Sequence, residues 1–323
     1  MNELPAKVSI IIPMYNAEEY LTSCLTSCIQ QTLFDIEILC VDDGSTDATA
    51  DIVRQYMKQD YRIQLISKEN GGLSSARNAG LHHANGTIIM FLDSDDYLSE
   101  NACERVWEEF LECEADIITF GTAIFPDIPK AIPWYYWTLT VKKARYNKFT
   151  PDVLFSNRNS KPFVWRQAFK SSFLRENKLT FDETVLFGED VVFQMEVFPH
   201  ASRFSYIPDR LYHYRHFREN SLMNSLSKAQ GQKVSEHLHI AKAVAEYWDK
   251  QGWIHLYEKE FLHWLISFVS DFGKTNEVLL SEEQYKELAS ILKQYELFSC
   301  LRKMPFKEHK TVRDICKYGN AYD

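Results

Sequence analysis

Residues 86–98 read GTIIMFLDSDDYL, in which an apolar run meets an acidic tract without any spacer. The apolar part, Thr87–Leu92, is short and continuous, which is typical of a strand buried on both faces of a parallel sheet. The acidic part, Asp93–Asp96, follows at the carboxyl end of that strand. Carboxylates crowded at such a place need a counter-ion, because an unpaired charge is costly to remove from water. The stretch therefore predicts a buried strand that ends in a cation site.

Similar apolar runs recur along the first 120 residues, at 8–13, 36–41, 62–67 and 115–120. Stretches with helical periodicity separate them, at 17–31, 46–58, 73–82 and 99–113. Strands that alternate with helices predict βαβ units and a mainly parallel sheet covered by helices on both faces. We therefore expect an α/β fold of the Rossmann-like kind.

Polar residues follow three of the expected strands directly. Pro13, Tyr15 and Asn16 come after the first strand, residues 42–45 (DDGS) after the second, and residues 93–96 after the fourth. Ligands of open α/β sheets lie beyond the carboxyl ends of the strands. The three segments are thus expected to line one cleft.

The spacing of Asp93 and Asp95 suits a divalent cation. Two carboxylates at a strand end can both reach one Mg²⁺ or Mn²⁺ ion, with phosphate and water as the other ligands. Such an ion eases the departure of a nucleotide diphosphate by neutralising its charge. The alternative interpretation is that the tract caps the helix expected near Ser99.

Residues 42–47 (DDGSTD) also have two interpretations. They can form a strand-to-helix turn, with Gly44 giving backbone freedom and Ser45 capping the helix. Asp43 can also accept a hydrogen bond from a uracil N–H or a ribose hydroxyl. The two interpretations are compatible.

Residues 71–78 (GGLSSARN) read as a glycine turn that feeds a helix. Arg77 then lies early in that helix and faces the strand ends, or it forms a surface salt bridge. Neither a glycine-rich dinucleotide fingerprint nor a phosphate loop is present, which argues against dehydrogenases and nucleoside triphosphatases.

The rest of the chain changes character twice. An aromatic, proline-bearing stretch at 126–140 includes Trp134–Trp137 and is either an acceptor platform or a loop folded onto the sheet. Short strand and helix signals return to about residue 214, and from 225 the pattern is helical. We expect a catalytic domain over 1–224, with a donor half (1–120) and an acceptor half (121–224), and a helical subdomain over 225–323.

Several ordered motifs resemble glycosyltransferase family 2, the inverting enzymes with the GT-A fold, and its bacterial polysaccharide-type members. They are VSIIIPMYNAEEYL, IEILCVDDGSTDAT, ENGGLSSARNAGL and GTIIMFLDSDDYL, all within residues 7–98, with weaker matches at LFGEDVVF and YHYRHFRENSLM. The resemblance implies a GT-A fold and a C-terminal helical extension. It also implies transfer of a hexose or N-acetylhexosamine from a UDP-sugar to a glycan or lipid-linked acceptor in cell-surface polysaccharide synthesis.

The resemblance also implies roles for single residues. The nucleotide and donor sugar would be bound by Pro13, Tyr15, Asn16, Asp43, Arg77, Asp93, Ser94, Arg215 and Ser221. Asp95, helped by Asp93, would hold Mn²⁺ or Mg²⁺. Asp190 would act as the catalytic base, with Glu189 bonding sugar hydroxyls, although Asp190 also suits a helix N-cap. His213 is either a packing histidine or a further metal ligand.

The composition restricts the classes of partner that the protein can bind. A net charge of −9 argues against nucleic acid, whose phosphates need basic surfaces. No apolar run reaches the length of a membrane span, and no signal peptide is recognisable, so we expect a cytoplasmic protein. Basic residues near the C-terminus leave peripheral binding to the inner membrane face open. The aromatic C-terminal helices form a core of their own or a homodimer interface.

Two other functions compete with glycosyl transfer. Nucleotidyl transfer shares the parallel sheet and the acidic metal site, but it would need a basic, glycine-rich loop where VSIIIPMYNAEEY stands. A non-catalytic subunit that binds nucleotide sugars would share the cleft and lack turnover. Release of UDP from UDP-sugars separates these possibilities.

Overall fold

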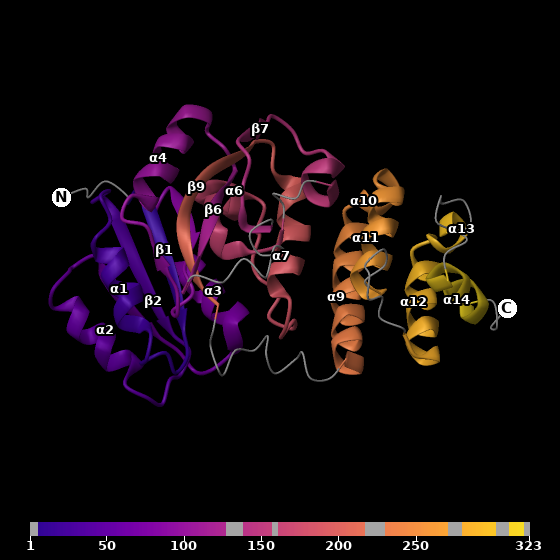
Figure 1. The fold of residues 1–323 in the computed structure, drawn as a ribbon, viewed down its shortest axis with the longest axis horizontal. Coiled ribbons are helices and arrows are strands. Elements are labelled where there is room, and N and C mark those ends of the chain that lie inside the picture. Colours follow the sequence, from indigo (N-terminus) through magenta and orange to yellow (C-terminus); the bar gives the residue numbers. More distant parts are fainter. Residues whose placement is uncertain are drawn as a thin grey trace. The chain divides into compact units, whose positions relative to one another are not determined.

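A computed structural model describes residues 6–126, 138–156, 161–216, 230–270, 280–301 and 310–319. The chain forms two compact units, Met1–Phe217 and Arg218–Asp323, each considered by itself below (Figure 1). The division falls near the boundary that the sequence suggested after residue 224.

The first half of the sheet is parallel, as predicted. Its strands lie in the order β3 (Ile63–Ser67), β2 (Ile36–Asp42), β1 (Val8–Met14) and β4 (Ile88–Phe91). Every residue of β1, β2 and β4 is buried. Burial on both faces explains why these strands read as continuous apolar runs without alternation.

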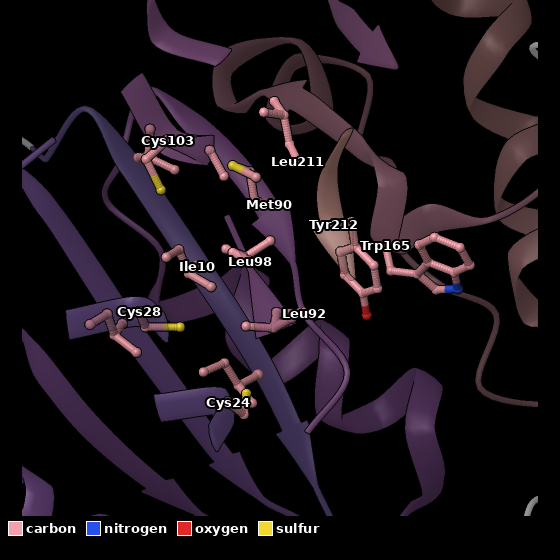
Figure 2. Close-up of a cluster of buried hydrophobic side chains, with 14 of the residues drawn as sticks. Ile10, Cys24, Cys28, Met90, Leu92, Leu98, Cys103, Trp165, Leu211 and Tyr212 are labelled. Carbon is pink, nitrogen blue, oxygen red and sulfur yellow. The ribbon is translucent and has the colours of Figure 1, made fainter. Parts of the chain in front are cut away.

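Helices cover both faces of this half. They are α1 (Leu21–Ile29), α2 (Thr49–Met57), α3 (Gly72–His83) and α4 (Ala102–Cys113). Cys24 and Cys28 of α1 pack with Ile10 of β1 in one core (Figure 2), and burial raises the pKa of Cys24. On α3, a Cβ at Gly80 would lie 2.3 Å from Ile11 Cγ2. Glycine is therefore required for α3 to approach β1 this closely.

The second half of the sheet is mixed, which the sequence did not reveal. Strand β8 (Gln167–Lys170) pairs antiparallel with both β4 and β6 (Ile117–Phe125). Strand β9 (Phe204–Arg215) runs parallel to β6, and β5 (Tyr97–Leu98) and β7 (Ala144–Tyr146) pair antiparallel with β9. Strand β8 (QAFK) begins and ends with polar residues, so it gives no continuous apolar run.

Strand β9 carries aromatic residues from the core to the acidic tract. Its register against β6 shifts on both sides of Gly121, where a Cβ would lie 2.8 Å from Pro208 O. The irregularity lets β9 continue beside β5, so Tyr212 of β9 lies opposite Leu98. Such bulges commonly re-aim a strand near a functional site.

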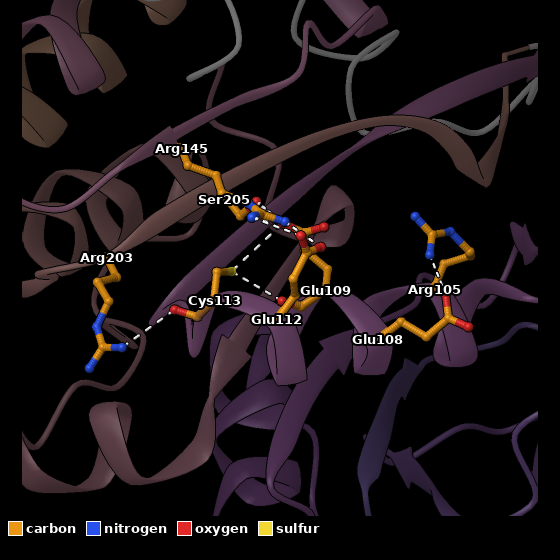
Figure 3. Close-up of polar contacts among 8 residues, drawn as sticks. All are labelled: Arg105, Glu108, Glu109, Glu112, Cys113, Arg145, Arg203 and Ser205. Atoms are coloured by element: carbon orange, nitrogen blue, oxygen red, sulfur yellow. Dashed lines mark hydrogen bonds and ion pairs between the residues drawn. The ribbon is translucent and has the colours of Figure 1, made fainter.

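A buried carboxylate fastens the outer strands. Glu109 of α4 accepts hydrogen bonds from Arg145 Nε of β7 (2.8 Å) and Ser205 Oγ of β9 (2.6 Å), as Figure 3 shows. The remaining described elements of this unit are short: η1 (Asp152–Ser156), η3 (Val164–Arg166), α6 (Ser171–Glu176), α7 (Glu189–Val197) and η4 (Phe198–His200).

All described elements of the second unit are helices, which confirms the predicted helical extension. They are α9 (Gln230–Lys250), α10 (Trp253–Leu256), α11 (Glu258–Ser270), α12 (Glu282–Gln294), α13 (Phe298–Leu301) and α14 (Lys310–Gly319). Trp248 is fully buried, with its ring 5.0 Å from that of Phe261, so these aromatics form a core. Among the described helices, none is long and apolar enough to cross a membrane. Homodimer and membrane contacts of this unit stay predictions.

Candidate functional site

Arg77 connects three carboxylates from distant parts of the chain. Its Nη1 donates to Glu189 Oε1 (2.9 Å) and Asp190 Oδ1 (2.8 Å), and its Nη2 donates to Asp93 Oδ1 (3.2 Å). The side chain is 1% exposed, and its guanidinium lies 5.2 Å from the ring centre of Phe181. A surface salt bridge, the alternative interpretation of Arg77, is therefore wrong. Helix α3, the end of β4 and the start of α7 meet here.

This cluster holds more negative than positive charge. Burial, opposed by Arg77, raises the pKa of Asp190 to about 8. Burial also raises the pKa of Asp93, and the positive charge of Arg77 partly offsets this rise. Burial alone would lower the pKa of Arg77, but the carboxylates of Asp190, Asp93 and Glu189 raise it. Asp190 can thus gain or lose a proton close to neutral pH.

Residues of β9 form hydrogen bonds that fix the acidic tract in place. Asp96 is 1% exposed, and its carboxylate accepts hydrogen bonds from Tyr212 Oη (2.6 Å) and Arg215 N (2.7 Å). Tyr212 Oη also accepts from Asp93 N (3.2 Å). Asp96 therefore braces the turn, and burial raises its pKa well above the ordinary value. The tract does not cap α4, whose N-cap is Asn101.

Asp93, Ser94 and Asp95 stay partly exposed at the end of β4. Arg215 Nε donates to Asp95 O (2.8 Å), which fixes the backbone between the two carboxylates. Within the described ranges, no group of three or more His, Cys, Asp or Glu side chains is placed to hold a metal ion. Mg²⁺ and Mn²⁺ bound with phosphates need only one or two protein carboxylates. The pair Asp93 and Asp95 fits such a cation.

The side chain of Asp43 is buried and makes several hydrogen bonds inside the protein. It is 3% exposed, and its carboxylate accepts from Lys68 Nζ (2.7 Å), Gly71 N (3.0 Å) and Gly72 N (2.8 Å). These contacts shape the glycine turn before α3. The role of Asp43 toward uracil stays a prediction. The expectation that Ser45 caps α2 is wrong, because that helix begins after Ala48.

The segment after β1 meets the segment after β2, as the strand-end argument predicted. Pro13 pairs with Val41 in the sheet. Asn16, with a positive φ of 49°, accepts from Thr46 N through Oδ1 (2.9 Å). Tyr15 is 52% exposed, so its ring is available to stack on a base.

His213 occupies a different environment from the acidic tract. Its Nε2 lies 2.9 Å from Ser99 Oγ, and its ring stacks on Tyr97 at 4.3 Å. Burial lowers the pKa of His213. These contacts favour the packing interpretation over the metal-ligand one. Ser221, expected near the diphosphate, lies outside the described residues.

Sequence reasoning missed the residues around η3. Val164 N donates to Asp190 Oδ2 (3.2 Å). On either side of it, Phe163 and Trp165 stack at 5.0 Å, and Trp165 stacks on Tyr214 at 5.4 Å. Phe163 and Tyr214 are partly exposed, so an aromatic wall stands beside Asp190. The platform expected at Trp134–Trp137 lies outside the described residues.

Known proteins resemble this chain in both sequence and fold. The pattern of "Glycosyl transferase family 2" matches residues 9–175. The uncharacterized glycosyltransferase EpsJ of Bacillus subtilis (strain 168) is 36% identical over 219 residues, which cover 64% of this chain and 60% of EpsJ. A poly(ribitol-phosphate) beta-glucosyltransferase of Bacillus spizizenii is 35% identical, over 68% of this chain and 33% of that protein. The chain thus spans only part of the length of these relatives.

Solved structures share the fold. S. aureus TarS in complex with UDP superposes with a TM-score of 0.65 at 20% identity, over 98% of this chain and 91% of that one. A mannosyltransferase from Pyrobaculum calidifontis, in complex with GDP-Man and Mn²⁺, superposes with a TM-score of 0.54 at 15% identity, over 99% and 89% of the two chains. These likenesses confirm the GT-A architecture.

Proposed function

Because the chain belongs to glycosyltransferase family 2, we propose that it transfers a sugar from a UDP-sugar to a glycan or lipid-linked acceptor. The donor sugar is a hexose or an N-acetylhexosamine, and the product belongs to a cell-surface polysaccharide. The single observation that carries the proposal is the Arg77 cluster, which joins Asp93 at the end of β4 to Asp190 at the start of α7. The closeness of a base candidate to a cation candidate supports the proposal.

Asp93 and Asp95 would hold Mn²⁺ or Mg²⁺. When bound, the cation neutralises charge that develops on the leaving diphosphate. Tyr212 and Arg215 keep this segment in place through Asp96 and the backbone, so the two carboxylates need not reorganise when the donor arrives. Tyr15 is proposed to stack on the uracil.

Asp190 would act as the base of a single in-line displacement. The acceptor hydroxyl gives its proton to the Asp190 carboxylate while its oxygen attacks the anomeric carbon. The bond from that carbon to the diphosphate breaks on the opposite face, so the configuration inverts. Arg77 and Val164 N each bond one oxygen of Asp190, which fixes the carboxylate without consuming all its lone pairs.

The acceptor is proposed to lie against the aromatic wall of Phe163, Trp165 and Tyr214. Sugar rings present apolar faces that pack on aromatic rings, and this wall flanks the amide that holds Asp190. Family membership favours glycosyl transfer over nucleotidyl transfer.

Release of UDP from a panel of UDP-sugars, with Mn²⁺ or Mg²⁺ and with a glycolipid extract as acceptor source, tests the proposal. Asp190→Asn should abolish turnover while circular dichroism stays unchanged. Asp51→Asn is the matched control, because Asp51 is exposed on α2 and its one ion-pair partner among the described residues is Arg54. Full activity of Asp190→Asn would refute its role as base. Binding of UDP-sugars without any release would favour the non-catalytic alternative.

A further inference from the structure

The side chain of Asn78 fastens the loop between α6 and α7 to helix α3. Asn78 Nδ2 donates to Phe181 O (2.9 Å), and Asn78 Oδ1 accepts from Phe181 N (2.8 Å). Nδ2 also donates to Glu183 Oε1 (2.9 Å). Because a side-chain amide has both a donor and an acceptor, it bonds the two backbone groups of Phe181 as a neighbouring strand would. These contacts hold the loop at one place along α3.

The ring of Phe181 lies in a buried aromatic cluster. The residue is 2% exposed. Its ring stacks on Phe193 of α7 at 3.9 Å and makes a T-shaped contact of 5.3 Å with Phe91, the last residue of β4. Phe193 follows Asp190 by one helical turn, and Phe91 shortly precedes Asp93. The ring therefore connects the element that carries the base candidate to the strand that carries the cation candidate.

The same ring lies against Arg77, the residue before Asn78. The Arg77 guanidinium is 5.2 Å from the ring centre of Phe181. A cation held over an aromatic face has fewer orientations available, so the ring helps to fix the nitrogens that bond Asp190 and Asp93. Among the contacts of the described residues, Asn78 bonds none of the three carboxylates around Arg77. Its influence on them would pass through Phe181.

We propose that Asn78 is a positioning residue for the base and acts through Phe181. While the amide holds the loop, the Phe181 ring keeps α7 and Arg77 in register with β4, and Asp190 stays where the acceptor proton must arrive. Reaction rates depend steeply on such placement, since a displacement of about 1 Å can cost about a hundredfold. The inference rests on the proposed function, because it concerns the geometry of the same reaction.

The first test is Asn78→Ala with UDP release as the assay. Alanine is the best helix former, so α3 itself is not weakened. On the high-pH plateau kcat should fall about three- to tenfold, the size of one net hydrogen bond, with less than a twofold change in the KM for the UDP-sugar. Asn177→Ala is the matched control, because this exposed amide also bonds a backbone carbonyl, Phe173 O (2.9 Å), within the last turn of α6.

The pH dependence of kcat/KM distinguishes positioning from a general loss of structure. A less constrained Arg77 stabilises the ionised form of Asp190 less, so the rising limb should move upward by about half a pH unit or more in Asn78→Ala. The limb of Asn177→Ala should coincide with that of the wild type.

Phe181→Leu is an independent second variant. It keeps the backbone groups that Asn78 bonds and removes the ring, so it should show the same fall in kcat and the same shift of the limb. Because both residues act through one loop, the double variant should lose less than the product of the two single losses.

Three results would overturn the positioning role of Asn78: an unchanged kcat, a limb that coincides with that of the wild type, or multiplicative losses in the double variant. Urea denaturation establishes that each variant is folded under the assay conditions. If Asn78→Ala does not fold, the limb of Phe181→Leu decides in its place. Absence of turnover by the wild type with every UDP-sugar would count against the proposed function and, with it, against the inference.

Discussion

Replacing Arg77 by lysine tests how the cluster controls its base. Arginine reaches Asp190 and Glu189 with Nη1 and Asp93 with Nη2. A lysine carries the same charge on one nitrogen at the end of a flexible stem, so it cannot bond carboxylates on both sides at once. We expect Arg77→Lys to leave Asp190 without its charge-assisted hydrogen bond.

The magnitude follows from that lost bond. A hydrogen bond to a charged group contributes about 1.5–3 kcal/mol, and a tenfold change in an ionisation constant corresponds to about 1.4 kcal/mol. Because Arg77 lowers the pKa of Asp190, its loss moves that pKa from about 8 to about 9 or higher. At pH 7 the ionised fraction of the base then falls about tenfold, and kcat/KM falls with it.

The assay is the pH dependence of kcat/KM, which reports the essential groups of the free enzyme. For the wild type, kcat/KM should rise with pH and level off above about 8, because Asp190 must be ionised to accept a proton. Arg77→Lys should shift this limb upward, whereas the exposed Arg54→Lys on α2 should leave it in place. Coincident limbs for wild type and Arg77→Lys would refute the reasoning.

Stability gives an independent check on the same variant. When the pKa of a buried carboxyl is higher in the folded than in the unfolded state, the free energy of unfolding falls as the pH rises through the folded-state pKa. Arg77→Lys should therefore lose more free energy of unfolding at pH 9 than at pH 6, measured by urea denaturation. An equal loss at both pH values would show that the lost packing, and not the unpaired charge, matters.

Three further predictions concern the surroundings of the cluster. Tyr212→Phe should lower the free energy of unfolding by about 2 kcal/mol, because it removes the hydroxyl shared by Asp96 and Asp93 N. Tyr61→Phe is the control: Tyr61 is 78% exposed, so this variant should keep nearly the same free energy of unfolding in the same denaturation experiment. Phe163→Ala should raise the KM for the acceptor and leave the KM for the donor unchanged in steady-state kinetics, and the reverse pattern would contradict the aromatic wall. Asp95→Asn should raise the Mn²⁺ concentration needed for half-maximal UDP release, by an order of magnitude or more, and an unchanged metal titration would remove Asp95 from the cation site.

The strands of the donor half could be predicted because their burial leaves a continuous apolar signal. Strands β1, β2 and β4 are buried at every position, and the polar residues after them meet because parallel strands end at one edge. Strand β5 escaped detection because two residues form no pattern, and β8 (QAFK) because polar residues at both ends break the apolar run that the equally short β4 (IIMF) has. The strand expected at 115–120 matches part of β6, but the antiparallel pairing of β8 with β4 and β6 was not readable from the sequence.

The site was readable only in part, for a related reason. Local sequence placed Asp93 and Asp95 at a strand end, but no local signal links Arg77 to Asp190, 113 positions away. Resemblance assigned both residues to the site without revealing that they touch. The contacts of Asp43 with Lys68, Gly71 and Gly72 likewise depend on how two separate turns meet.

Arg77 shares its one positive charge among three acidic groups, so the cluster has no spare positive charge to attract an anion before a cation has bound. A free UDP-sugar, with its own negative diphosphate, would therefore gain no attraction from the cluster. A cation that arrives first, or already paired with the nucleotide, would supply the missing positive charge. The enzyme would then follow an obligatory order of addition, with metal before or together with nucleotide. Calorimetric titration of UDP into chelator-treated protein should accordingly give little heat, and addition of Mn²⁺ should restore tight, saturable binding.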